Sequence, residues 1–330
     1  MRLGLTLLAL AYTAGLIAYF AALGLGAGQD GWLGVVRELT LYVFLPAPAL
    51  LLAAVLLRGR AALLLMLLPI GLFAWFYGPQ FVPRARAEGA GPKFRALTFN
   101  AGGNEVGGRP EPLIRLLRTE QPDLVALQEI PRSTLDVLAA TLSDDYPYQV
   151  GTPDTATLSH FPVLAANDVL LDASGYLSEQ LELDVEGQIV TVTNVHVKRP
   201  TAGLSLRRIL SWARTYDAGW RDAQMEAIAA RVRSVTGPQL LMGDFNQTPW
   251  STSYSLIATQ LHDSFREVGW GFGNTFPNQL TGLGAGLALP LLRIDYVFHS
   301  GELIAQDAHT GPDAGSHHLP VVVDLALREP

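Results

Sequence analysis

The sequence of 330 residues contains no cysteine. A chain without cysteine has no disulfide framework, no thiol nucleophile and no zinc-thiolate site. Charged residues are also few, at 16% of the chain. They are so unevenly spread that the chain divides near residue 83 into two parts of different character.

The first 83 residues carry almost no charge. They contain three uncharged runs of 27, 19 and 23 residues, between Arg2 and Asp30, between Glu38 and Arg58, and between Arg60 and Arg84. A helix needs about 20 mostly apolar residues to cross a bilayer. The runs predict three transmembrane helices, at about 4–27, 39–57 and 61–82, in a membrane domain spanning 1–83. The sequence thus implies a lipid bilayer as a partner.

The short loop that holds Arg58 and Arg60 indicates the topology. Positively charged short loops stay in the cytoplasm, which places the rest of the chain on the outer face of the cytoplasmic membrane. Four basic residues between 84 and 95 argue for the opposite orientation. They belong to a linker (84–92) and to the first strand of a folded domain, where charge counts for less than in a short loop. We expect a multi-pass protein with its catalytic domain outside.

The second part of the chain is acidic. From Arg84 onward there are 19 Lys and Arg against 28 Asp and Glu, which leaves a net charge of −9. Proteins that bind duplex nucleic acid tightly and without sequence preference carry a basic footprint. The charge balance therefore disfavours that class of function.

Strand and helix patterns alternate after the linker. Residues 181–186 alternate apolar and acidic side chains, and Gly187 separates them from a second extended segment, which is the pattern of two strands joined by a turn. Further strands are predicted within 95–103, 123–130, 238–249, 292–300 and 319–327, and helices within 111–120, 134–143, 225–235 and 251–261. This order predicts an α/β domain at 93–330, a sandwich of two sheets flanked by helices.

Several predicted strands end in polar side chains. The apolar run Leu240–Met242 leads to Asp244 and Asn246, which lie two residues apart and so point the same way from an extended chain. Residues of the same kind stand at other strand ends: Asn100, Gln128, Glu129, Asn194, His196, Asp295 and His318. Each alone is also explained as a turn former, a surface histidine or a salt-bridge partner. Together they predict one polar rim of the sandwich.

Carboxylates that meet at such a rim repel one another unless a cation lies among them. Oxygen ligands without cysteine favour a hard divalent ion, Mg²⁺ or Mn²⁺. An Asp–Asn pair that holds a water molecule and histidines that contact phosphate oxygens complete a site suited to phosphoester hydrolysis.

Six segments resemble, in order and approximate spacing, the motifs of the endonuclease/exonuclease/phosphatase family. They are LTFNAGG, PDLVALQEI, VTNVHV, LLMGDFNQTP, RIDYVFHS and SHHLPVVVDL, and the similarity covers roughly residues 93–328. The resemblance implies a four-layer, deoxyribonuclease-like fold and a phosphoesterase of the membrane-anchored bacterial type.

The resemblance also implies roles for single residues. Glu129 is similar to the main metal ligand, with Asn100 beside it. Asp244 and Asn246 resemble the pair that positions the attacking water. His196 resembles the histidine that contacts the phosphate.

The end of the chain both matches and departs from the family. Asp295 resembles the carboxylate that orients the final histidine, which here is His318. The closing family motif usually reads Ser-Asp-His, whereas this chain reads Ser316-His317-His318. The missing acid normally lies near the metal, so His317 either tunes the choice of metal or turns away and leaves a single metal at Glu129.

These observations predict a membrane-anchored, metal-dependent phosphoesterase. Its substrate is a phosphodiester or phosphomonoester, with a lipid headgroup favoured and DNA or RNA as the alternative. A noncatalytic membrane scaffold or receptor is a third interpretation. The apolar segment at 280–292 either dips into lipid or packs as a buried loop. The segment at 204–216 is either an interfacial amphipathic helix or ordinary packed structure.

Overall fold

The computed structural model describes residues 1–28, 30–84, 89–102, 110–171, 177–200, 216–278 and 289–329. The segments at 204–216 and 280–292 lie largely outside these ranges. The chain divides into two compact units, which are described separately. The first holds Met1–Val82 and Pro200–Ala218, and the second holds Pro83–Arg199 and Gly219–Pro330.

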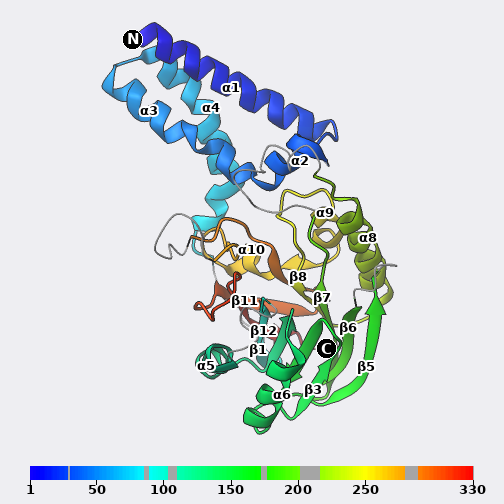
Figure 1. Ribbon diagram of the computed structural model, residues 1–330. Helices are drawn as coiled ribbons and strands as arrows, with labels where there is room; N and C mark the ends of the chain where they lie inside the picture. The colour runs from blue at the N-terminus through cyan, green and yellow to red at the C-terminus, as the bar shows by residue number, and fades with distance from the viewer. Residues whose placement is uncertain are drawn as a thin grey trace. The chain divides into compact units, whose positions relative to one another are not determined.

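The first unit is helical (Figure 1). Its elements are α1 (Arg2–Gly24), α2 (Gly31–Glu38), η1 (Thr40–Phe44), α3 (Pro46–Leu56), α4 (Arg60–Tyr77) and η2 (Gly78–Phe81). Helices α1, α3 and α4 pack on one another through a small apolar core that includes Ala9, Ala54 and Met66. Their other faces expose large apolar side chains, such as Leu7 and Leu64. Helices α1 and α4 are long and apolar enough to cross a membrane.

The second predicted span, at 39–57, is interrupted. The chain bends by 81° between Gly31–Glu38 and Thr40–Leu56, and it forms a third span only if this bent pair is counted as one. Pro46 occupies the first position of α3, where its missing N–H costs no intrahelical hydrogen bond. Alone, α3 has 11 residues, and a helix of that length covers only about half of a bilayer's hydrocarbon core.

Three of the four basic residues before residue 83, Arg2, Arg58 and Arg60, gather at one end, while the fourth, Arg37, donates to the carbonyl oxygen of Ala27 just after the other end of α1. Arg2 Nε donates to the carbonyl oxygen of Leu57 at 2.8 Å. The start of α1 therefore lies beside the loop between α3 and α4, which carries Arg58 and precedes Arg60.

The second unit contains two six-stranded sheets (Figure 1). The first has the order β11-β12-β1-β2-β4-β3 and the second the order β5-β6-β7-β8-β10-β9. The strands are β1 (Lys93–Asn100), β2 (Leu124–Gln128), β3 (Tyr148–Gly151), β4 (Thr155–Ser159), β5 (Val163–Leu170), β6 (Leu177–Val185), β7 (Gln188–His196), β8 (Gln239–Asp244), β9 (His262–Asp263), β10 (Asp295–His299), β11 (Leu303–Thr310) and β12 (Val321–Leu327). The pairs β1/β2 and β7/β8 are parallel, and the other neighbours are antiparallel.

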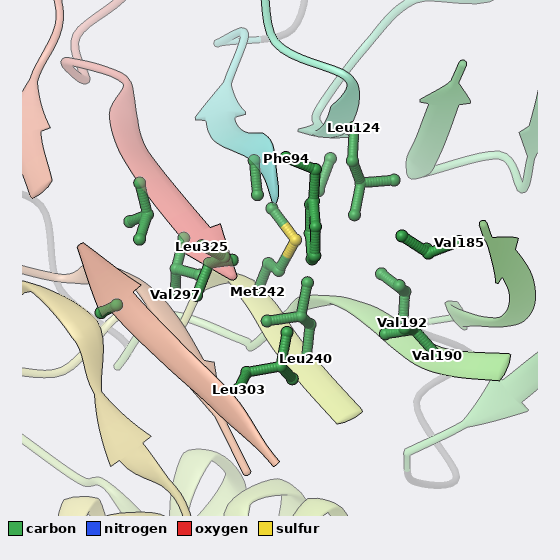
Figure 2. Close-up of a cluster of buried hydrophobic side chains, with 14 of the residues drawn as sticks. Phe94, Leu124, Val185, Val190, Val192, Leu240, Met242, Val297, Leu303 and Leu325 are labelled. Carbon is green, nitrogen blue, oxygen red and sulfur yellow. The ribbon is translucent and has the colours of Figure 1, made fainter. Parts of the chain in front are cut away.

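The sheets and helices form four layers, so the predicted α/β sandwich is confirmed. The apolar side chains between the two sheets, among them Phe94, Val192 and Met242, form the central core (Figure 2). Helices α5 (Pro110–Glu120) and α6 (Arg132–Thr141) bury their apolar faces on the first sheet. Helices α8 (Gly219–Ser234) and α9 (Tyr254–Ala258) cover the second, and α10 (Ser264–Val268) follows β9.

The strands and helices predicted for this unit all occur, but five strands were not predicted: β3, β4, β5, β9 and β11. Strand β4 (TATLS) is buried at every position and is short, so it has no alternation for a pattern to detect. Helix α9 is also shorter than the predicted helix at 251–261.

Candidate active site

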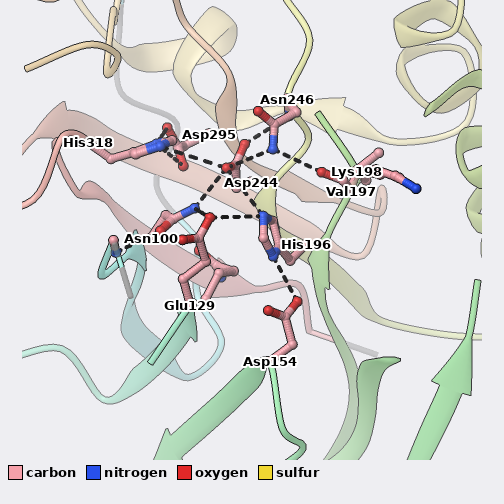
Figure 3. A network of polar contacts seen from close by, with 12 residues as sticks. Asn100, Glu129, Asp154, His196, Val197, Lys198, Asp244, Asn246, Asp295 and His318 are labelled. Carbon is pink, nitrogen blue, oxygen red and sulfur yellow. Dashed lines mark hydrogen bonds and ion pairs between the residues drawn. The ribbon is translucent and has the colours of Figure 1, made fainter. Parts of the chain in front are cut away.

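The topology brings the polar strand ends to one rim. Strands β1, β2, β7 and β8 run towards this rim, and each ends at, or one residue before, one of the polar residues predicted for the site. Strands β4, β10 and β12 are antiparallel to their neighbours there, so they begin at the same rim. The side chains gathered in this way are Asn100, Glu129, Asp154, His196, Asp244, Asn246, Asp295 and His318 (Figure 3).

Asp244 lies at the centre and is 1% exposed. Its Oδ1 accepts a hydrogen bond from the Asn246 N–H at 2.8 Å, and its Oδ2 accepts from the side-chain amides of Asn100 at 2.9 Å and Asn246 at 3.1 Å. Burial raises the pKa of Asp244 and the charge of Asp295 adds to this, whereas His318 and His196 oppose it. The carboxylate is thus held rigidly by three donors.

Gly243 allows this strand end to approach its neighbour. Its φ is +144°, and a Cβ at this position would lie 1.9 Å from the carbonyl oxygen of Val195. Any larger residue would push β8 away from β7 and move Asp244.

His318 and Asp295 form one histidine–carboxylate pair. His318 Nδ1 lies 3.0 Å from Asp295 Oδ2, which also accepts from the Thr275 hydroxyl, and His318 Nε2 lies 3.9 Å from Asp244 Oδ2. Burial favours the neutral imidazole, but the charges of Asp295 and Asp244 outweigh it and raise the pKa of His318 to about 9.

His196 and Asp154 form a second pair of the same kind. His196 Nδ1 lies 2.7 Å from Asp154 Oδ2, and its Nε2 lies 3.4 Å from Glu129 Oε1. Burial lowers the pKa of His196, but the Asp154 hydrogen bond and the carboxylates of Asp244, Asp154 and Glu129 raise it overall. The two pairs face Asp244 from opposite sides with their Nε2 atoms (Figure 3).

Asp154 is a site residue that the sequence reasoning missed. It immediately precedes β4, and the pairing of Gln128 with Thr155 places it at the rim. Like Asp295, Asp154 is an acidic residue at the start of a strand. This pattern identifies Asp154 only after β4 itself has been predicted.

Glu129 is the most open of the carboxylates, with a side chain 40% exposed. It follows β2 with φ +49°, and its Oε1 accepts from the Asn100 amide at 3.2 Å. Asn100 therefore bridges Glu129 and Asp244 as a donor, while its own oxygen accepts from Gly102 N. The metal role of Asn100 and Glu129 stays a prediction.

The donor set fits a divalent cation. Asp244, Asp295 and His318 are buried, and each has a ligand atom within 4.8 Å of the others. Two buried carboxylates that face each other across paired strands are stabilised when a cation lies between them. His317 is not one of these three; its carbonyl oxygen accepts from Asn278 N, and its expected effect on the metal stays a prediction.

A family model described as "Endonuclease/Exonuclease/phosphatase family" matches residues 97–318, which is more than half of the chain. The chain belongs to the endonuclease/exonuclease/phosphatase family. No curated protein sequence matches it.

Solved structures agree with this endonuclease/exonuclease/phosphatase fold. An endonuclease/exonuclease/phosphatase from Bacteroides vulgatus is 18% identical, with a TM-score of 0.59, and the match covers 72% of this chain and 99% of that one. One from Beutenbergia cavernae is 22% identical (TM-score 0.51, 72% of each chain). The human Nocturnin catalytic domain with a bound sulfate anion is 17% identical (TM-score 0.52, 73% of this chain and 97% of that one).

Proposed function

We propose that this chain is a membrane-anchored, metal-dependent phosphoesterase that hydrolyses a phosphodiester or phosphomonoester with an activated water. Members of its family are hydrolases that act on phosphoester bonds. The observation that carries the proposal is the buried Asp244 carboxylate, fixed by three amide donors and flanked by two histidines that each have a carboxylate partner.

Asp244 is assigned as the base that orients and deprotonates the water. A general base needs a fixed position and a pKa nearer to neutrality than that of a free carboxyl group. The amide donors of Asn100 and Asn246 fix the position of the Asp244 carboxylate, and burial raises its pKa. Asn246 is assigned to hold the same water, because its amide lies beside the Asp244 carboxylate.

His196 and His318 are assigned to the phosphate and to the leaving group. Each binds a carboxylate through Nδ1, which leaves Nε2 to face the site. The pKa of each is raised, which favours the protonated imidazole, and His318 with its pKa of about 9 is cationic near neutral pH. An Nε2–H group of this kind donates to an anionic phosphate oxygen. The sulfate bound in the Nocturnin structure is a tetrahedral anion of the kind that such donors hold.

Glu129 is assigned as the main ligand for Mg²⁺ or Mn²⁺, because it is the most open carboxylate of the site. Asp244 and Asp295 offer further carboxylate oxygens close by. When bound, the ion supplies positive charge that stabilises the phosphoryl oxygens in the transition state.

The first unit supports membrane anchoring and one orientation. Helices α1 and α4 are apolar enough to cross a bilayer, and the end that holds Arg2, Arg58 and Arg60 fits the cytoplasmic side by the positive-inside rule. Residues from 83 onward follow the opposite end of α4, which favours an outer-face catalytic unit. With a net charge of −9 after residue 83, a phospholipid headgroup suits the site better than a nucleic acid, which is the alternative substrate.

The proposal is tested with the full chain in detergent micelles. Phospholipids, inositol phosphates, DNA and RNA are offered as substrates, each with Mg²⁺, Mn²⁺ or chelator. We expect metal-dependent turnover of a phospholipid or another small phosphoester. Turnover of DNA or RNA alone would assign a nuclease, and no turnover of any substrate with any divalent ion would support the scaffold.

A further inference from the structure

One buried carboxylate of the second unit takes no part in the proposed chemistry. Four acidic side chains are buried in the described part of this unit: Glu179, Asp244, Asp263 and Asp295. Two of them belong to the active site, and Asp263 pairs with Arg293. Glu179, on β6, is 1% exposed and forms no ion pair among the described residues. A buried carboxylate without a cation is costly and calls for a reason.

The hydrogen bonds of Glu179 come from neutral groups. Its Oε1 accepts from the N–H of Thr152 at 3.0 Å, and its Oε2 accepts from the hydroxyl of Thr157 at 2.7 Å. Burial raises the pKa of Glu179 to about 7, and the two threonine hydrogen bonds offset this only in part. The carboxylate of Glu179 therefore satisfies the Thr152 N–H and the Thr157 hydroxyl, while its own contact with water is lost.

Thr152 begins the tight turn between β3 and β4. Its N–H is shared between Glu179 and the carbonyl oxygen of Thr155 at 2.9 Å, and its hydroxyl accepts from the N–H groups of Asp154 and Thr155. Because Thr157 lies on β4, Glu179 binds the residue that opens the turn and a residue of the strand that follows it. The whole 152–155 turn is thus anchored to the opposite sheet.

Asp154, inside this turn, contacts two groups of the active site. Its carboxylate binds Nδ1 of His196 at 2.7 Å. Its carbonyl oxygen accepts from the N–H of Glu129 at 2.9 Å, and Glu129 has the left-handed φ of +49°. A shift of the turn would therefore move the phosphate-binding histidine and the main metal ligand together.

We propose that Glu179 is a positioning residue for the active site, an inference that rests on the function proposed above. Its carboxylate anchors the 152–155 turn, and Asp154 in that turn fixes both His196 and Glu129. Glu179 touches neither substrate nor metal. Residues that orient a metal ligand or a catalytic side chain in this way typically contribute about 10- to 100-fold in metal affinity or activity.

The test compares Glu179→Ala, Glu179→Gln and Thr157→Val in the full chain in micelles. Glu182 is on the same strand and exposed, so Glu182→Ala and Glu182→Gln are matched controls. Three quantities are measured well below the unfolding temperature. They are the ¹⁵N imidazole signals of His196 in chelator, assigned with His196→Gln, the Kd for Mn²⁺ by calorimetry, and kcat.

We expect Glu179→Ala to shift the His196 signals, to raise the Kd for Mn²⁺ by about 10- to 100-fold and to lower kcat similarly. Glu179→Gln keeps an acceptor for Thr152 and should fall between wild type and alanine, and the Glu182 variants should match wild type. If Glu179→Ala does not fold, Glu179→Gln and Thr157→Val give the same comparison.

Unchanged His196 signals together with a Kd within twofold of the controls would overturn the proposal and leave Glu179 as a buried packing residue. A failure of the proposed phosphoesterase function would give a different result from a failure of the Glu179 proposal. In that case wild type turns over no phosphoester, while the His196 signals still report whether Glu179 orients the histidine.

Discussion

Replacing Asp244 with Asn tests the central carboxylate. The substitution keeps the volume of the side chain and removes its charge. A positioned general base contributes roughly 10²- to 10⁴-fold to the rate, which is about 3–5 kcal/mol of transition-state stabilisation at about 1.4 kcal/mol per tenfold. We therefore expect Asp244→Asn to lower kcat by at least about a hundredfold.

The effect on stability should be much smaller. Three donors, from Asn100 and Asn246, lie 2.8–3.1 Å from the carboxylate oxygens. The new NH₂ group leaves one or two of them without an acceptor, at a cost of about 1–3 kcal/mol for each. The loss of a buried charge whose pKa is raised offsets part of this cost. The net change in the free energy of unfolding should therefore stay within about 2 kcal/mol.

The assay pairs initial rates on bis(4-nitrophenyl) phosphate, or on the best substrate found, with thermal unfolding by circular dichroism. Asp144→Asn, at an exposed position, is the control and should match wild type in both. If Asp244→Asn folds normally and keeps more than a tenth of wild-type kcat, Asp244 only terminates a strand and the proposed mechanism is wrong.

Three further predictions concern the metal, pH and topology. His317→Asp should raise the ratio of Mg²⁺ to Mn²⁺ activity, because Mg²⁺ prefers oxygen ligands; an unchanged ratio would exclude a tuning role. The pKa of His318 is raised to about 9 from an ordinary 6.5, so its stabilising contribution is complete below about pH 6.5 and is lost as pH rises through about 9. In chelator, the melting temperature of wild type should therefore fall between pH 7 and 9, more steeply than that of His318→Gln, and parallel curves would refute this. Protease added to intact spheroplasts should remove the catalytic unit, whereas protection until the membrane is opened would reverse the topology.

The strand ends show what the sequence can predict. Leu240–Met242 is a strong local signal that leads directly to the end of β8. The alternation at 181–186 identifies β6, which the Gly187 turn joins to β7 and its end at His196. The side chains at those ends then met at one rim because the register of the sheets brings them there. Asp154 was not predicted as a site residue, because β4 is buried at every position and shows no alternation of apolar and polar side chains.

Other features depend on contacts between residues distant in sequence. In the structure Arg293 precedes β10 and pairs with the buried Asp263, while Asp295 binds His318. A pattern of alternation does not specify partners 30 residues away. The break before α3 is local, but the prolines that mark it are compatible with either one kinked span or two separate helices.

The dependence of hydrolysis on a divalent metal tests the account most directly. The full chain is stripped with chelator, assayed on the substrate panel, and assayed again after Mg²⁺ or Mn²⁺ is restored. We predict no measurable turnover in chelator and full recovery with metal in wild type, with recovery reduced at least tenfold in Glu129→Gln. Equal turnover with and without chelator would contradict the account.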